Sequence, residues 1–488
     1  MKQYIILATA AVFGAAACVS VGKNANAKPS TANMGQQQTV TAYYNTTCSN
    51  CHGVNGEGGG GGTRSLNTWE KFDESNDKKF FDVIKNGSEG GMEAYGAALT
   101  DAQIWAQVVH IRELQYKALR AEKGSPKAVN GVYSSKHAKF KVEEVIPQGS
   151  GLKTPWGVDW LPDGRMLVTN RPGSMMIMDK SGALTSIEGM PQTIELGQGG
   201  LLDVAVHPKY AQNGWVYICY ADPGPDGSAL TKIARGKISF GLGTPKWTNQ
   251  QTIFEAPKEF YSRAGVHFGS RIAFDKSDHV YFVVGERGVN ERAQKLDNPY
   301  GKIYRLNDDG TEPKDNPFIG RTGGIKGVWT YGHRCPQGLA FDLDGNLWNT
   351  EHGPRGGDEL NMVQKGGNYG WPTFLYSINY NDMPMGSPWP KNGEKINQPA
   401  HRWLPSIAAS GLDVVRGPAF PGWKGDLIAG GLAGSMVERV RMKGGKKVEA
   451  EELLQGIGRV RDISTGPDGY VYITLNQPDK VIRLVPAK

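Results

Sequence analysis

Cysteine is scarce in this chain of 488 residues, which contains only five. Two of them lie three residues apart near the N-terminus, one lies in an apolar leader segment, and Cys219 and Cys335 stand alone. So few thiols exclude a disulfide framework as the source of stability. The length instead suggests two or three domains that bury their own cores.

Long apolar runs and clusters of one charge are also missing. The apolar run from Tyr4 to Val19 is too short for a good membrane span. The net charge is +7, but Lys and Arg are scattered along the chain. This pattern argues against a basic stripe that binds nucleic acid and against a polybasic patch that binds a membrane. We therefore expect no nucleic-acid partner and no transmembrane span.

The first residues are typical of a secretory signal. Lys2 precedes the apolar run, and the small-residue site Ala25-Asn26-Ala27 follows it, which predicts a cleaved signal peptide over residues 1–27 and a periplasmic protein. An alternative is a bacterial lipoprotein signal with lipid attached to Cys18. Ala15 is a weak match to the aliphatic residue expected three positions earlier, so ordinary cleavage is favoured. Either way the protein is exported.

The pentapeptide Cys48-Ser49-Asn50-Cys51-His52 has the spacing of a c-type haem attachment site. Cys48 and Cys51 can reach the two vinyl groups of one porphyrin, and His52 then lies beneath the iron as its ligand. The alternative is a redox disulfide or half of a zinc site. No second cysteine pair accompanies this one, which disfavours the zinc site.

Residues 28–118 are predicted to form a small all-α domain around this motif. Its clearest element is a helix from Ala102 to Ala118, where apolar residues recur at helical spacing after a capping threonine. Residues 119–138 lose this periodicity and gain polar and turn residues. They are predicted to be a linker.

Met92 is the candidate for the second haem-iron ligand. It lies forty residues after His52, on a loop, which is typical of the thioether ligand in a class I cytochrome c. The alternative is a buried packing methionine. His110 offers a bis-histidine haem instead, but it falls within the apolar pattern of the last helix and is expected to pack there.

Residues 139–488 contain a degenerate repeat of two alternating strands joined by a turn. The composition, with 66 glycines and 28 prolines, also indicates many tight turns. Six copies at uneven spacing predict a six-bladed β-propeller, so the fold class is mainly β with a small helical domain in front. Loops at the central mouth of such a ring are candidate binding segments, although they can also be mere connections. The copies are 157–168, 202–219, 271–284, 338–348, 412–429 and 460–474.

Five inter-strand segments are richer in glycine and polar residues than a connection requires. In this order they resemble the PQQ-dependent soluble aldose sugar dehydrogenases of the glucose/sorbosone dehydrogenase family, over essentially all of 140–488. With the helical part, the chain is similar to such an enzyme fused to a class I cytochrome c. The segments are Leu196–Leu202, Gly265–Arg271, Tyr331–Gly338, Glu351–Glu359 and Gly366–Pro372.

The resemblance implies a role for individual residues. His267 would be the general base that takes the proton of the anomeric hydroxyl, a task that suits an imidazole. Cationic and polar residues would hold PQQ, a tricarboxylate. Gly353 and Pro354 would bind a calcium ion at the quinone, and Glu359 and Tyr369 a second one. The implied PQQ residues are Gln198, Arg334, Cys335, Ser406, Arg459 and Arg461.

Three positions depart from the family pattern. Cys335 stands where the family usually has Asn, which removes an amide contact and places a thiol near the quinone. Ala433 and Leu404 occupy positions where some members use Lys and Trp on the cofactor. These changes bear on cofactor affinity more than on the type of reaction.

These features together predict an exported dehydrogenase that oxidises aldoses to lactones. PQQ would accept two electrons, and the fused haem c would pass them singly to an external acceptor, a cytochrome or a quinone. Two alternatives stay open. One is a sugar-binding propeller that has lost catalysis and carries an electron-transfer haem. The other is a PQQ enzyme that acts on a non-sugar alcohol.

Overall fold

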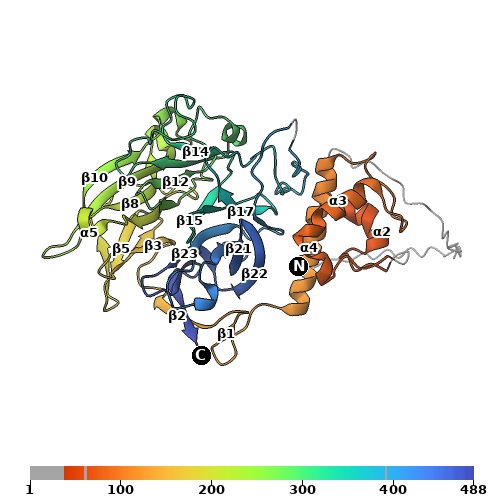
Figure 1. Ribbon diagram of the computed structural model, residues 1–488, viewed down its shortest axis with the longest axis horizontal. Coiled ribbons are helices and arrows are strands. Elements are labelled where there is room, and N and C mark those ends of the chain that lie inside the picture. The colour runs from red at the N-terminus through yellow and green to blue at the C-terminus, as the bar shows by residue number, and fades with distance from the viewer. Residues whose placement is uncertain (1–37, 60–62, 391–392) are drawn as a thin grey trace, which may run out of the picture.

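The computed structural model describes residues 38–59, 63–390 and 393–488. It consists of a small helical domain beside a large β-propeller (Figure 1). The predicted signal peptide over 1–27, with Cys18, lies outside the described residues. In the part of the chain that is described, no helix is long and apolar enough to cross a membrane.

Short helices surround one long helix in the N-terminal domain. Helix α4 begins at Asp101, one residue before the predicted start, because the side chains of Thr100 and Gln103 cap each other's backbone N–H groups. It continues beyond the predicted end at Ala118, since Leu119 is buried, and it stops before Gly124, whose φ is 67°. The helices are α1 (Val40–Tyr43), the π-helical turn η1 (Tyr44–Cys48), α2 (Ser49–His52), α3 (Asp77–Asn86) and α4 (Asp101–Lys123).

The propeller has six antiparallel blades, which confirms the predicted fold class. The first three blades are β3 (Pro155–Trp160), β4 (Met166–Asn170), β5 (Ser174–Met178), β6 (Leu184–Ile187); β7 (Leu201–Val206), β8 (Val216–Pro223), β9 (Ala229–Ser239), β10 (Lys246–Phe254); and β11 (Ile272–Phe274), β12 (Val280–Val284), β13 (Lys302–Leu306), β14 (Val328–Tyr331). A short helix, α5 (Tyr210–Asn213), joins β7 to β8.

The fourth blade is β15 (Pro336–Phe341), β16 (Leu347–Glu351), β17 (Asp358–Val363), β18 (His401–Trp403). The fifth is β19 (Ala409–Val414), β20 (Leu427–Gly431), β21 (Met436–Lys443), β22 (Lys446–Gln455). The sixth is β23 (Arg459–Thr465), β24 (Val471–Asn476), β25 (Lys480–Ala487), extended by β2 (Lys139–Ile146) and β1 (Tyr133–Ser134). Each predicted repeat coincides with the two innermost strands of one blade.

The ring is closed by pairing its two ends. Strand β2, from the beginning of the propeller, pairs with β25, from its end, so that the last blade leaves no open seam. Around the centre, aspartates on inner strands accept hydrogen bonds from the next blade, as Asp159 does from Val206 (2.6 Å) and Asp203 from Ile272 (2.8 Å). These bonds fix the blades in register with one another.

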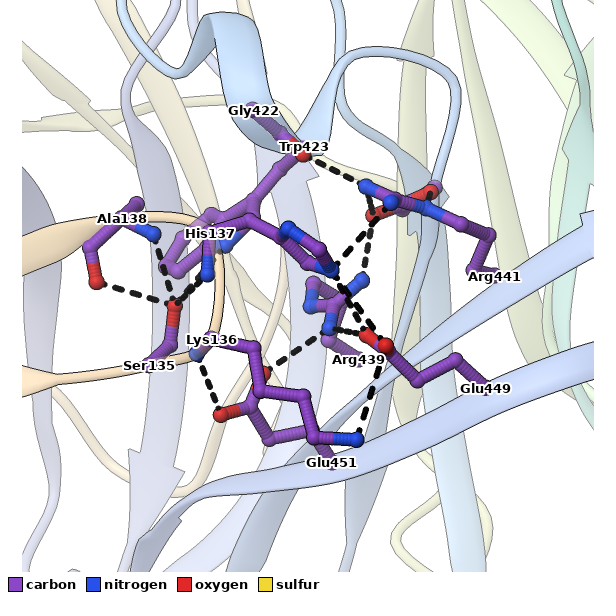
Figure 2. Close-up of polar contacts among 11 residues, drawn as sticks. Ser135, Lys136, His137, Ala138, Gly422, Trp423, Arg439, Arg441, Glu449 and Glu451 are labelled. Carbon is purple, nitrogen blue, oxygen red and sulfur yellow. Dashed lines mark hydrogen bonds and ion pairs between the residues drawn. The ribbon is translucent and has the colours of Figure 1, made fainter.

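The chain between the two domains is attached to the propeller surface (Figure 2). Ser135 accepts a hydrogen bond from the Trp423 indole (3.1 Å), and the backbone N–H of Lys136 donates to Glu451 (2.8 Å). The His137 ring lies 3.0 Å from Glu449. The second half of the predicted linker is therefore held on blade five.

Candidate active site at the propeller mouth

The end of the ring where the inner strands begin is called here the propeller mouth. All inner strands run in the same direction, so loops that precede them converge on this end. Five of the six inner strands, β3, β7, β15, β19 and β23, also carry a register shift near their first residues. Such bulges turn side chains out of the regular alternation, and they are common beside functional sites.

The predicted site residues of the propeller lie at these strand beginnings. Gln198 precedes β7, His267 precedes β11, Arg334 precedes β15, and Ser406 precedes β19. Arg459 and Arg461 are the first and third residues of β23. Residues far apart in the sequence are therefore brought to one end of the ring by the fold.

His267 is held at the mouth by contacts on its backbone and its ring. Its backbone N–H donates to the Gln198 amide oxygen (2.8 Å), and its φ of 51° is unusual for a residue with a side chain. The Nδ1 atom of the ring is paired with the buried Glu286 carboxylate. Nε2 is the ring nitrogen left for a substrate proton.

The His267 environment favours the neutral ring. Burial lowers the pKa of His267, and the nearby Arg334 lowers it further, although hydrogen bonding to Glu286 acts in the opposite direction. A pKa below the usual 6.5 leaves the imidazole unprotonated at neutral pH. It can therefore accept a proton, as a general base must.

Buried cations with incomplete partners surround this histidine. The Arg334 guanidinium stacks over Trp371 (5.2 Å to the ring centroid), and that of Arg461 stacks over Trp156 (4.6 Å). The Nε atoms of both arginines and Nε2 of His352 are buried without a hydrogen-bond partner among the described residues. Unpaired buried donors of this kind require a ligand or ordered water.

The pKa values of these groups are lowered first by burial and then by neighbouring positive charge. Burial, followed by the nearby Arg334, His267 and Arg461 side chains, lowers the pKa of His352 to about 3. Burial and the neighbouring Arg459 and Arg171 lower the pKa of Arg461 to about 9. An anion with several carboxylates would relieve both the repulsion and the missing hydrogen bonds. The residues present therefore fit PQQ.

Two predicted PQQ residues are engaged within the protein. The Ser406 hydroxyl donates to Asp358 (2.6 Å), which also accepts from the backbone N–H of Gly353 (2.9 Å). Cys335 is fully buried, and its sulfur accepts a hydrogen bond from Gln337 (3.2 Å). Burial raises the pKa of Cys335 to about 11, so that its thiol stays neutral.

Three of the four predicted calcium residues, Gly353, Glu359 and Tyr369, line one small cavity, and Pro354 does not. A cavity of about 20 Å³ is lined by Arg334, Gly353, Glu359 and Tyr369, among others. This volume is on the scale of a single water or ion. The Tyr369 hydroxyl already donates to the Met362 carbonyl (2.7 Å). The backbone carbonyl of Tyr369 is therefore the candidate calcium ligand.

Two carboxylates next to this cavity share one amide. Asn361 donates to Glu351 (2.9 Å) and to Glu359 (3.1 Å). Burial, with the charge of Glu351 second, raises the pKa of Glu359 well above its usual range. A calcium ion would stabilise the charged form of Glu359. Within the described chain no three His, Cys, Asp or Glu side chains form a metal cluster. Backbone carbonyls are ordinary calcium ligands, so the residues fit.

The haem motif lies on η1 and α2 of the helical domain. One helical turn separates Cys48 from Cys51, which places both thiols on one face. Burial lowers the pKa of His52, and its buried Nδ1 has no partner among the described residues. Met92 packs against the same apolar cluster as Cys48. Two thiols, a neutral imidazole and a thioether fit a c-type haem.

His110, the alternative iron ligand, is buried in α4 at 5% exposure. Its ring lies 4.8 Å from that of Tyr44, between centroids, and neither ring nitrogen has a hydrogen-bond partner in the described part of the chain. Burial lowers the pKa of His110, so the ring is neutral. Its place is between the haem motif and the propeller.

Three residues that shape the mouth have no role predicted from the sequence. Glu286 orients His267, His352 adds an unpaired nitrogen, and Asp358 ties the Ser406 loop to Gly353. All three follow or begin a buried strand next to glycine, at the mouth end of the second or third strand of a blade. A polar residue at that position of a predicted repeat is the sequence signal that could have identified these three residues.

Comparisons with known proteins agree with this architecture. The family model described as glucose/sorbosone dehydrogenase matches residues 152–483. The model described as cytochrome c oxidase, cbb3-type, subunit III matches residues 35–111. Aldose sugar dehydrogenase YliI of Escherichia coli (strain K12) is 38% identical over 331 residues, which cover 67% of this chain and 88% of the relative.

Solved structures show the same fold. The soluble aldose sugar dehydrogenase from Escherichia coli in its apo-form is 36% identical, with a TM-score of 0.65, covering 71% of this chain and 100% of that one. The PQQ-bound form of aldose sugar dehydrogenase from Streptomyces coelicolor is 27% identical, with a TM-score of 0.59, covering 71% and 98%. The chain belongs to the glucose/sorbosone dehydrogenase family, and its N-terminal helical part is a cytochrome c domain.

Proposed function

We propose that this protein is an exported, PQQ-dependent dehydrogenase that oxidises aldose sugars at the anomeric carbon to lactones. Calcium and haem c complete its cofactors, and an external cytochrome or quinone is the final acceptor. The observation that carries the proposal is the pairing of His267 with Glu286 beside two buried arginines, Arg334 and Arg461, whose Nε atoms have no hydrogen-bond partner among the described residues. The PQQ-bound relative supports the identity of the cofactor.

His267 acts on the substrate proton. Its Nε2 accepts the proton of the anomeric hydroxyl while the hydrogen on the anomeric carbon leaves as hydride, and Glu286 at Nδ1 stabilises the charged ring that results. PQQ, when bound, supplies the quinone that accepts hydride. Arg334, Arg461 and His352 would hold its carboxylates.

Calcium and the haem would be bound by separate sets of residues. Gly353, Pro354 and the Glu359–Tyr369 pair would bind calcium, which polarises a carbonyl as a Lewis acid. Cys48 and Cys51 would attach the haem, and His52 and Met92 would ligate its iron. Export rests on the N-terminal sequence, and a mature protein beginning at Lys28 would support it.

The experiment is dye-linked oxidation of a panel of aldoses by purified protein, with PQQ and calcium added separately and together. We expect oxidation only when both are present, with the lactone as product. A panel of simple alcohols serves as the comparison. Oxidation of alcohols but not aldoses would show that the substrate is a non-sugar alcohol. If neither panel is oxidised in a PQQ-dependent way, the proposal is contradicted.

A further inference from the structure

We propose that the cytochrome c domain is permanently docked on blade four through α4, with Glu113 and Arg355 as the central positioning pair, and that electrons cross α4 to reach the haem. This inference rests on the proposed function for the identity of the electron source. The docking itself rests on the contacts described next.

Arg355 lies directly after the predicted calcium ligands Gly353 and Pro354. Its guanidinium forms a two-pronged pair with Glu113 of α4, at 2.7 Å from Nε and 2.6 Å from Nη2. Its remaining nitrogen, Nη1, donates to Asp382 (2.6 Å). One side chain thus joins the loop at the mouth to the helix of the other domain.

Asp382 extends this contact to the beginning of α1. Its carbonyl accepts from the N–H of Val40 (2.8 Å), and its carboxylate accepts from the N–H of Thr41 (2.9 Å). An acidic residue of the propeller therefore satisfies N–H groups that a helix leaves unpaired at its start. The helix that leads into the haem motif is held by the same cluster as Arg355.

An apolar layer lies beside these charges. Trp105 of α4 meets Tyr376 (centroids 5.7 Å apart) and Trp389 (5.8 Å) of the propeller, and Trp389 stacks near Phe81 of α3 (4.1 Å). One continuous buried cluster includes residues of both domains. Domains move relative to one another unless their interface is large and hydrophobic, and this interface shares a core.

Further ion pairs hold the rim of the interface. Arg402 of β18 donates to Asp77 of α3 (2.5 Å), which is buried, and Arg120 near the end of α4 donates to Glu452 of β22 (2.5 Å). The chain beyond α4 is attached at both ends, by Ser125 to Gln455 (2.6 Å) and by the contacts of residues 135–137 shown in Figure 2. These contacts fix the connecting segment on the propeller, so the helical domain does not rotate about it.

The docked arrangement sets the direction of electron transfer. The haem motif on η1 and α2 lies on the side of α4 away from the propeller (Figure 1). A chain of contacts crosses the helix from Arg355 to Glu113, then to His110 (3.9 Å), then to Tyr44 (4.8 Å between rings), four residues before Cys48.

The electrons balance along this route. Oxidation of one aldose to its lactone releases two electrons and two protons. His267 accepts the proton of the hydroxyl, and the second hydrogen leaves as hydride to the quinone, which would release it as a proton when it is reoxidised. The electrons reduce ferric haem iron to ferrous in two successive steps, and a one-electron external acceptor oxidises the haem after each. Each step crosses the same fixed interface.

The test is Glu113→Arg, with Glu122→Arg as the matched control on an exposed part of α4. Aldose is mixed with PQQ- and calcium-loaded protein, and haem reduction is followed by stopped flow. In wild type and control we expect a first-order rate that does not change with protein concentration. In Glu113→Arg we expect a rate at least tenfold lower, with dye-linked aldose oxidation unchanged.

Two further measurements separate this inference from folding defects and from the proposed function. Hydrogen exchange of α4 should become faster in Glu113→Arg, and Glu113→Arg combined with Arg355→Glu should restore both α4 protection and haem reduction. Unchanged haem reduction and α4 protection in Glu113→Arg would overturn the docking. Absent dye-linked oxidation in wild type would instead refute the proposed function, and α4 exchange alone would then decide the docking.

Discussion

The propeller mouth and the haem motif hold their groups in opposite ways. The mouth collects His267, Arg334 and Arg461 from three different blades, so its chemistry exists only when the whole ring is closed. The haem motif places Cys48 to His52 within two consecutive helical turns. A change in one blade should therefore affect the mouth without affecting haem attachment, and the reverse should also hold.

The largest effect is expected from His267→Ala. Loss of a general base costs about 10²- to 10⁴-fold in rate, so dye-linked aldose oxidation should fall by that factor while the haem spectrum stays unchanged. His279→Ala, a histidine of the β11–β12 turn, is the control. Equal losses in the two variants, or none in His267→Ala, would mean that the base is misassigned.

Arg334→Ala tests whether the incompletely paired arginines at the mouth bind PQQ. A charge-assisted hydrogen bond is worth about 1.5–3 kcal/mol, which predicts a PQQ dissociation constant about 10- to 100-fold higher in a binding titration. Arg165→Ala, on an exposed turn, should leave it unchanged. Unaltered PQQ affinity in Arg334→Ala would show that the cation cluster serves the fold alone.

Met92→Ala tests the helical domain separately. Removing a thioether ligand should lower the haem potential in a redox titration, because methionine ligation raises it, while dye-linked oxidation by the propeller stays unchanged. An unchanged potential and spectrum would point to His110 or another ligand in place of Met92.

The pH dependence tests how Glu286 supports His267. Only the neutral imidazole accepts a proton, so kcat/KM should be constant near neutral pH and fall as the pH drops through the His267 pKa, below 6.5. Glu286 raises this pKa, so Glu286→Gln should move the fall to lower pH and reduce the plateau about tenfold. A fall that moves to higher pH would contradict this geometry.

The same contrast explains what could be predicted from the sequence. The haem motif and the capped start of α4 are local, and the six repeats mark the inner strands of all six blades. Glu286 becomes a neighbour of His267 through the pairing of β11 with β12, and His352 approaches it from the next blade, so spacing along the chain alone does not reveal them. The Glu113–Arg355 pair joins residues 242 positions apart, which no local pattern encodes.

The most direct test of the account is anaerobic haem reduction by an aldose in protein loaded with PQQ and calcium. We expect excess aldose to reduce the haem fully, omission of PQQ to abolish the reduction, and His267→Ala to slow it by about 10²- to 10⁴-fold. Aldose oxidation by the loaded protein with the haem remaining oxidised would contradict the claim that the propeller mouth supplies electrons to the cytochrome c domain.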